Sequence, residues 1–285
     1  MKPHFIEDCP KYILKGTSWS LQGFSEAGNR TGFYFSGPNI LLDAGVNTYK
    51  NPSAIFITHS HTDHVQNLPP VIQGPDRKKS IPIYVPPNSA DRIDSYIKSY
   101  YALDHGDFND NLPNYNIYKI DENTPLVLSG NIRVDSIKCN HKCNHNEVEC
   151  FGFSFSISKH KLKKKFKFWT PNQIKRARES GEEILEEIVT CPLVYMGDTE
   201  ENVLDEIMAY HRPETIITEC TILHEKNRIS GHTCWENGLE NVVRKYPETT
   251  FILIHWSRRY NDTEIQEFFN TQDVKNVILW LRSTS

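Results

Sequence analysis

Three histidines and one aspartate fall within six consecutive residues, as His-Ser-His-Thr-Asp-His at positions 59–64, directly after the apolar residues 55–57. Neutral imidazoles and carboxylate oxygens suit Zn²⁺, and a catalytic zinc site leaves one coordination position for water. With this spacing His59 and His61 can face one ion, while Asp63 and His64, beyond a bend in the chain, face a second. The motif therefore predicts two adjacent metal sites. The alternative is a histidine-rich turn in solvent that binds no metal.

Three later apolar runs also end in a residue that can bind a metal. Residues 132–139 lead to His141, residues 193–196 to Asp198 and residues 251–254 to His255. One histidine at a strand end is commonly just solvated, but the carboxyl ends of strands in layered α/β sheets gather at one edge and often carry a ligand site. We therefore expect these residues to complete two zinc sites, with His59, His61 and His141 on one ion, Asp63, His64 and His255 on the other, and Asp198 bridging.

Two alternatives in the same region stay open. His145 lies a few residues beyond His141 and could replace it as the third ligand of the first site. Cys139 and Cys143 could form a separate zinc clip, although structural zinc sites generally use four ligands and only two thiols are close together here. The ligand types also leave iron or manganese open in place of zinc, because His and Asp bind all three.

The bulk composition excludes several classes of protein. The chain has 285 residues and a net charge of −4, so no global field attracts it to nucleic acid and any polyanion must bind a local patch. Seven cysteines, an odd number without a paired framework, favour a reducing compartment. No apolar run approaches the ~20 residues that span a bilayer. We therefore expect a cytoplasmic protein without a membrane segment.

The order of predicted elements indicates one domain. Residues 11–14 and 19–24 have the pattern of a strand pair, and Asn88 or Ser89 can cap a helix that runs to about Leu103. Strands and helices alternate through both halves of the chain, without a Pro- or Ser-rich linker between them. We therefore predict a single α/β domain over residues 1–285, with sheets inside and helices outside.

A basic insertion at about 159–169 is the best local patch for an anionic substrate. Its six lysines include Lys163, Lys164 and Lys165, and the aromatic residues among them could stack on nucleic-acid bases. The alternative is a solvated charged face without function. Arg258 and Arg259 directly follow the strand end at 255, where a guanidinium can hold a phosphate at two points.

Several short motifs, in order from about Gly23 to Tyr260, resemble those of a known family. They are Thr58-His59-Ser60-His61-Thr62-Asp63-His64 with Leu68-Pro69, Lys138-Cys139-Asn140-His141, Lys161-Leu162-Lys163-Lys164, Met196-Gly197-Asp198-Thr199, Glu219-Cys220-Thr221, Gly231-His232, and Ile254-His255-Trp256-Ser257-Arg258-Arg259-Tyr260. On these motifs the chain resembles the metallo-β-lactamase superfamily and, within it, short-form ribonuclease Z, the tRNA 3′-processing endonucleases. The resemblance implies an αββα sandwich of two mixed sheets with helices outside, two zinc ions per chain at the sheet edge, and a homodimer.

The resemblance also implies roles for individual residues. A metal-bound hydroxide would attack the phosphodiester, with Asp63 as a zinc ligand that orients it. His232 would stabilise the scissile phosphate and protonate the departing 3′ oxygen, a role that suits a group with an unperturbed pKa near 6.5. The alternative for His232 is a residue at a helix start without a chemical role. Glu219 is expected to hydrogen-bond a ligand histidine.

Two departures from the family pattern bear on the substrate. Residues 142–149 form a longer loop than the family's. The segment between Gly152 and Asp198 is expected to be too short for the long flexible arm with which the bacterial enzymes clamp tRNA. A small-molecule hydrolase of the same fold, acting on a phosphodiester, ester or thioester, is therefore the alternative to a zinc endoribonuclease that removes the 3′ trailer of precursor tRNA. A metal-binding module that has lost catalysis is a third hypothesis.

Overall fold

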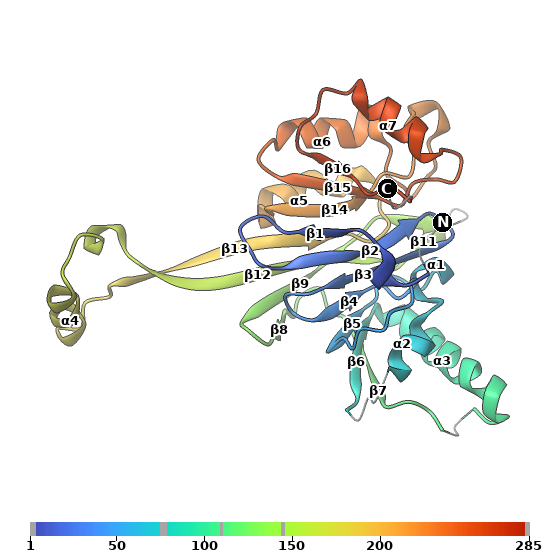
Figure 1. The fold of residues 1–285 in the computed structure, drawn as a ribbon, viewed down its shortest axis with the longest axis horizontal. Coiled ribbons are helices and arrows are strands. Elements are labelled where there is room, and N and C mark those ends of the chain that lie inside the picture. The colour runs from blue at the N-terminus through green and yellow to red at the C-terminus, as the bar shows by residue number, and fades with distance from the viewer. Residues whose placement is uncertain (1–3, 75–78, 109–110, 144–145, 283–285) are drawn as a thin grey trace.

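Two seven-stranded sheets lie face to face in the computed structural model, which describes residues 4–74, 79–108, 111–143 and 146–282. Helices cover the outer face of each sheet (Figure 1). The expected αββα sandwich with two mixed sheets is therefore confirmed. No helix in the described ranges is long and apolar enough to cross a membrane.

The first sheet comes from the N-terminal part of the chain, in the order β1-β2-β3-β4-β5-β6-β7. Neighbours are antiparallel from β1 to β4 and parallel from β4 to β7. Its strands are β1 (Lys11–Ile13), β2 (Ser20–Glu26), β3 (Arg30–Phe35), β4 (Ile40–Leu42), β5 (Ala54–Phe56), β6 (Ile81–Val85) and β7 (Tyr115–Lys119). The short helix α1 (Thr62–Val65), which follows β5, carries the second half of the histidine motif.

The second sheet has the order β16-β15-β14-β13-β12-β9-β8. Neighbours from β13 to β16 are parallel, and the others are antiparallel. Its strands are β8 (Leu126–Leu128), β9 (Ile132–Lys138), β12 (Phe151–Leu162), β13 (Leu185–Tyr195), β14 (Thr215–Glu219), β15 (Thr250–Ile254) and β16 (Val277–Leu279). The strands β10 (His141–Cys143) and β11 (Asn146–Val148) pair in a separate hairpin, in the loop that we expect to be longer than the family's.

Aromatic side chains fill the space between the two sheets. Phe56 of the first sheet meets Phe153 of the second with ring centroids 5.1 Å apart, and Phe35 meets Phe155 at 5.3 Å. All four are fully buried. Burying side chains of this size contributes roughly 1.5–3 kcal/mol each, so this layer fixes the relative position of the sheets and of the loops at their ends.

Apolar helix faces close the outer sides of the sandwich. The helices α2 (Leu68–Gln73) and α3 (Ala90–His105) pack on the first sheet. The second sheet is covered by α5 (Leu204–His211), α6 (Glu240–Lys245) and α7 (Asp262–Asn270). Ser89 precedes α3 as expected, but its hydroxyl bonds Ser60 at 3.1 Å instead of capping the helix. A π-helical turn, Trp235–Leu239, directly precedes α6.

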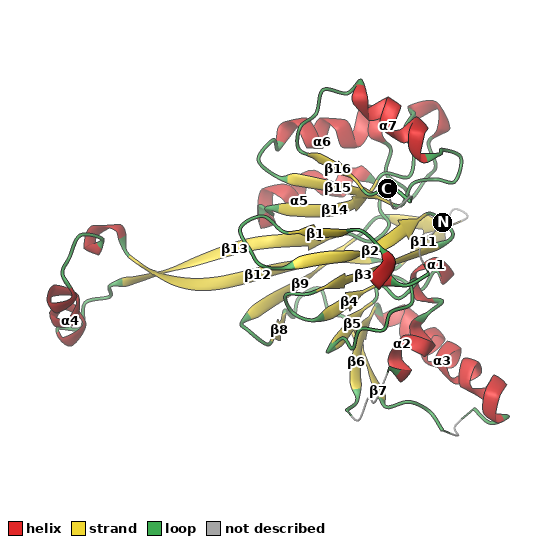
Figure 2. Cartoon of the chain, viewed as in Figure 1, coloured by secondary structure: helices red, strands yellow, loops and turns green. Residues whose placement is uncertain are grey.

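A long arm projects from the second sheet, formed by the outer halves of β12 and β13 (Figure 2). The two strands stay paired from Ser158 opposite Val189 to Leu162 opposite Leu185, whereas β9 pairs with β12 only over Phe151–Ile157. The tip holds α4 (Pro171–Glu179) over a small buried core of Phe166, Ala177 and Ile184.

The expectation that residues 152–198 are too short for an arm is therefore wrong. A two-stranded ribbon with both faces in solvent needs no alternation of apolar and polar residues, so its sequence has the appearance of a solvated charge run. The helix α4 ends just before Gly181, which has a φ of 80°.

Candidate metal centre

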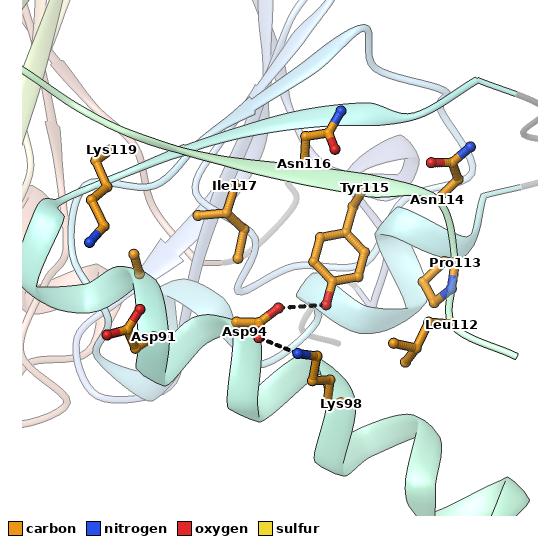
Figure 3. A pocket seen from close by; sticks show the side chains of 11 residues that line it. Asp91, Asp94, Lys98, Leu112, Pro113, Asn114, Tyr115, Asn116, Ile117 and Lys119 are labelled. Carbon is orange, nitrogen blue, oxygen red and sulfur yellow. Dashed lines mark hydrogen bonds and ion pairs between the residues drawn. The ribbon is translucent and has the colours of Figure 1, made fainter. Parts of the chain in front are cut away.

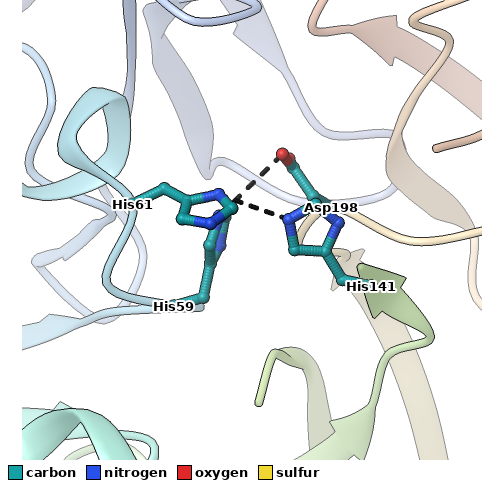
Figure 4. A group of neighbouring side chains, drawn as sticks. All are labelled: His59, His61, His141 and Asp198. Atoms are coloured by element: carbon teal, nitrogen blue, oxygen red, sulfur yellow. Dashed lines mark hydrogen bonds and ion pairs between the residues drawn. The ribbon is translucent and has the colours of Figure 1, made fainter. Parts of the chain in front are cut away.

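The seven predicted ligands gather at one edge of the sandwich, where β5, β9, β13 and β15 end. The ligand atoms of His59, His61, His141 and Asp198 lie within 4.8 Å of one another, and Figure 4 shows these side chains converging. A second group with the same spacing contains Asp63, His64 and His255.

Asp198 lies between the two groups. Its Oδ1 is 3.4 Å from Nε2 of His64, and its Oδ2 is 3.4 Å from Nε2 of His255 and 3.9 Å from Nε2 of His59. One carboxylate therefore faces ring nitrogens of both groups, which is the geometry expected of a bridging ligand. The side chain is 5% exposed, so the cluster is almost closed to bulk water on this side.

Asp43 orients two of the histidines and was missed from the sequence. It follows β4 with a φ of 56° and is fully buried. Nδ1 of His64 donates to its Oδ2 at 2.8 Å, and the hydroxyl of Thr58, which lies 3.0 Å from Nδ1 of His59, donates to it at 3.0 Å. Tyr195 donates a further bond at 2.8 Å. Asp43 ends an apolar strand as the ligands do, and that signal could have identified it.

Glu219 forms a matching arrangement on the other side of the cluster. Its carboxylate accepts a hydrogen bond from Nδ1 of His232 at 3.0 Å and one from the hydroxyl of Thr221. That hydroxyl lies 3.0 Å from Nδ1 of His255. The expected contact of Glu219 with a ligand histidine is therefore indirect, through Thr221, and its direct partner is His232.

His141 completes the pattern, because its Nδ1 donates to the carbonyl oxygen of Gly231 at 2.8 Å. In each of His59, His64, His141 and His255, one ring nitrogen is held by a neighbour and the other faces the cluster. Such second contacts fix the ring orientation and the tautomer of metal-binding histidines. The structure thus directs ring nitrogens at the cluster, where Nε2 of His141 also lies 3.3 Å from Nδ1 of His61 and Nε2 of His255 lies 3.4 Å from Oδ2 of Asp63.

Two observations show that these residues fit a metal. The Nε2 atoms of His59 and His64 are buried and have no hydrogen-bond partner among the described residues, a costly state for a polar atom unless a ligand satisfies it. Burial and the neighbouring histidines hold the pKa of His59 well below its usual value and lower the pKa of His61 to about 4. Both rings are therefore neutral near pH 7, as metal ligation requires.

Asp198 and Asp63 supply the negative charge of the histidine cluster. Burial disfavours an ionised Asp198, but His255 and His64 outweigh it and lower the pKa of Asp198 to about 2. The pKa of Asp63 is likewise low despite its burial, because of its hydrogen bond to His255. Asp63 also accepts a hydrogen bond from the backbone N–H of Gly28 at 3.0 Å.

The other predicted residues fall in two places. Arg258 and Arg259 are exposed and line a cavity of about 490 Å³ together with His232. The side chain of His232 is 19% exposed, and its Nδ1 is 4.0 Å from Oδ2 of Asp198. Lys163, Lys164 and Lys165 lie at the arm tip, apart from this cavity.

Both alternatives at the first site involve side chains outside the described part of the chain. His145 and the side chain of Cys143 lie outside the described residues. Cys139 is buried in the core under α5, in the same cluster as Cys150.

A separate cavity of about 510 Å³ lies between α3 and β7 (Figure 3). Asp94 accepts a hydrogen bond from the Tyr115 hydroxyl at 2.8 Å and pairs with Lys98 at 2.7 Å. No residue that lines it belongs to the histidine cluster, and we assign it no function.

Comparison with known proteins gives the class. Residues 34–164 match the beta-lactamase superfamily domain. The solved structure of yeast PDE1 has a TM-score of 0.60 to this chain at 13% identity, covering 95% of this chain and 96% of that one. The metallo-beta-lactamase fold protein YhfI from Bacillus subtilis has a TM-score of 0.59 at 14% identity, covering 92% and 95%. With the histidine cluster, these matches define a metal-dependent hydrolase of the metallo-β-lactamase fold.

Curated relatives narrow the class. The chain is 27% identical over 268 residues to tRNase Z TRZ1 of Arabidopsis thaliana, covering 90% of this chain and 92% of that protein. It is 28% identical over 276 residues to ribonuclease Z of Pyrococcus horikoshii, covering 81% of each. The chain is therefore similar over most of its length to proteins named tRNase Z and ribonuclease Z.

Proposed function

We propose that this protein is a dinuclear zinc endoribonuclease that removes the 3′ trailer of precursor tRNA. The observation that carries the proposal is the position of Asp198 between two groups of ligand atoms, with His232 beside it. The names of the curated relatives, tRNase Z and ribonuclease Z, supply the substrate class.

The proposed ligands divide as the two groups do. His59, His61 and His141 would hold one zinc, Asp63, His64 and His255 the other, and Asp198 both. Two zinc ions bound here would lower the pKa of a water molecule and neutralise charge on the phosphodiester during attack.

The protein's own side chains orient the attacking water and protonate the departing 3′ oxygen. Asp63, held by the Gly28 N–H, can accept a hydrogen bond from the attacking water and orient it. His232 carries a proton near neutral pH, because Glu219 and Asp198 outweigh burial and raise its pKa to about 9. We assign to it the donation of a proton to the departing 3′ oxygen, which leaves a 3′-hydroxyl on the tRNA. Arg258 and Arg259, in the adjoining cavity, are suited to hold phosphates of the bound strand.

The arm supports RNA over a small ester as the substrate. Residues 159–188 contain nine Lys or Arg and five Glu, a net charge of +4 in a chain with a net charge of −4. Lys163 pairs with Glu183 at 2.7 Å and Lys165 with Glu182 at 2.6 Å, so part of this charge is already neutralised. Phe168 is 90% exposed at the tip and can stack on a base. A basic arm far from the metal centre cannot contact a small substrate bound there, but it can bind a large polyanion.

Three further features belong to this proposal. We propose two zinc ions per chain, a homodimer by family resemblance, and a cytoplasmic location. The described cysteines, six free buried thiols, are consistent with a reducing compartment.

Cleavage of an end-labelled precursor tRNA by the zinc-loaded protein tests the proposal. We expect a single cut after the discriminator nucleotide, lost in Asp63→Ala. Hydrolysis of bis(p-nitrophenyl) phosphate without cleavage of precursor tRNA would reject the tRNA substrate and favour the small-molecule hydrolase. Zinc binding without hydrolysis of either substrate would favour the non-catalytic module.

A further inference from the structure

Glu200 joins two loops that are far apart in the sequence. Its backbone N–H donates to the carbonyl of Asn140 at 2.9 Å, and its Oε2 accepts from Nδ2 of the same residue at 3.2 Å. Its Oε1 accepts from the backbone N–H of Gly231 at 2.7 Å and from the Ser230 hydroxyl at 3.4 Å. One side chain thus holds the residues that directly precede His141 and His232.

The two loops also contact each other. Nδ1 of His141 donates to the carbonyl of Gly231 at 2.8 Å, so the ring that faces the metal cluster is oriented by the loop that carries His232. Gly231 has a φ of 84°, and a Cβ there would lie 2.4 Å from the backbone nitrogen of Lys142. The hairpin that begins at His141 is therefore packed directly against the backbone of Gly231.

A carboxylate is the group that this position requires. The donors of Asn140, Gly231 and Ser230 all point at its two oxygens, and an ionised carboxylate offers acceptors only. A glutamine at the same position would keep the size of Glu200 but turn one acceptor into a donor. At least one loop would then lose its contact.

We propose that Glu200 is a positioning residue that holds His141 and His232 as one unit. It acts through Asn140 and Gly231 and contacts neither the proposed metal nor the substrate. The inference rests on the proposed metal centre but not on tRNA as the substrate. Residues that orient metal-binding histidines typically affect metal affinity or activity by 10–100-fold.

Zinc affinity of the full chain tests the proposal without any turnover. Competition with the chromogenic chelator 4-(2-pyridylazo)resorcinol measures how tightly each ion is held. We expect Glu200→Gln to weaken one of the two zinc sites by roughly tenfold or more. In a His141→Ala background the same substitution is expected to have no further effect, because it acts through that ring. For hydrolysis of bis(p-nitrophenyl) phosphate by Glu200→Gln, we expect kcat to fall while KM changes little.

Glu206→Gln is the matched control. It removes the same charge from a nearby exposed position on α5 and is expected to leave zinc affinity unchanged. An equal loss in that control, or an equal effect of Glu200→Gln with and without His141, would show a general charge effect and overturn the proposal.

A second variant and two further outcomes keep the test decisive. If Glu200→Gln fails to fold, Asn140→Ala removes a single donor to Glu200, and unchanged zinc affinity in that variant overturns the proposal. A wild-type chain that retains no zinc rejects the proposed metal centre and this inference together. Two tightly held ions that Glu200→Gln leaves unaffected reject this inference alone.

Discussion

The Nδ1 atom of His232 lies 3.0 Å from a carboxylate oxygen of Glu219, a residue that is 1% exposed at the end of β14. This contact keeps the charged form of His232 in a site where burial alone would neutralise it. It is therefore the contact on which the proposed proton donor depends.

Glu219→Gln is expected to shift the pH profile of catalysis. Because the pKa of His232 is raised to about 9, its acid form persists below that pH and is lost as the pH rises through it. The neutral amide removes this support, so the alkaline limb of kcat/KM moves to lower pH, with a loss of roughly 10-fold in kcat. Glu267→Gln, on the exposed side of α7, is the control. An alkaline limb that stays in place would exclude His232 as the group that titrates.

Zinc binding is expected to release protons. Burial lowers the pKa of His64, but Asp198 and Asp43 outweigh it and raise the pKa to about 10, so the metal-free ring is protonated near pH 7. A ligand ring must be neutral, so binding displaces that proton and zinc affinity falls as the pH falls. Calorimetry in buffers of different ionisation enthalpy counts the protons. His64→Ala should release one fewer, and an unchanged count would assign the proton to another group.

Removing the arm separates the two candidate substrates. Because Ser158 and Val189 are paired directly, an Asn-Gly turn can join these strands and leave the body of the sandwich intact. We expect KM for precursor tRNA to rise roughly tenfold or more and its salt dependence to weaken, since fewer phosphates are neutralised. Turnover of bis(p-nitrophenyl) phosphate should not change.

The triple change of Lys163, Lys164 and Lys165 to Ala is a milder version of the same test. It is expected to weaken RNA cleavage and spare the small substrate. Equal losses on both substrates in either variant would argue that the arm supports the fold and not RNA binding.

Asp43→Asn is expected to destabilise the metal-free protein by about 3 kcal/mol, because the buried protonated His64 loses its charged partner. Tyr195→Phe removes one hydrogen bond from the same carboxylate and is expected to cost about 1 kcal/mol. Urea unfolding of both variants gives the comparison. Equal effects would mean that Asp43 acts as an ordinary hydrogen-bond acceptor and not as a counter-charge.

Sequence alone was sufficient to predict the layered fold and the grouping of the seven candidate ligands. Apolar strands such as β5 and β15 are followed within three residues by His59 and His255, and the ends of parallel strands meet at one edge of a sheet. The local sequence is therefore enough to predict which residues lie at the strand ends where the candidate ligands meet. Whether the seven residues bind zinc stays a prediction.

Only the tertiary structure revealed the arm and the contacts that orient the histidines. The arm has no apolar periodicity, because a ribbon exposed on both faces buries little and its charged residues fit a solvated segment equally well. The partners of Asp43 and Glu200 lie up to 152 and 60 residues away in the chain. Spacing in a sequence reports neighbours along one element, whereas the packing of two sheets decides which strand ends meet.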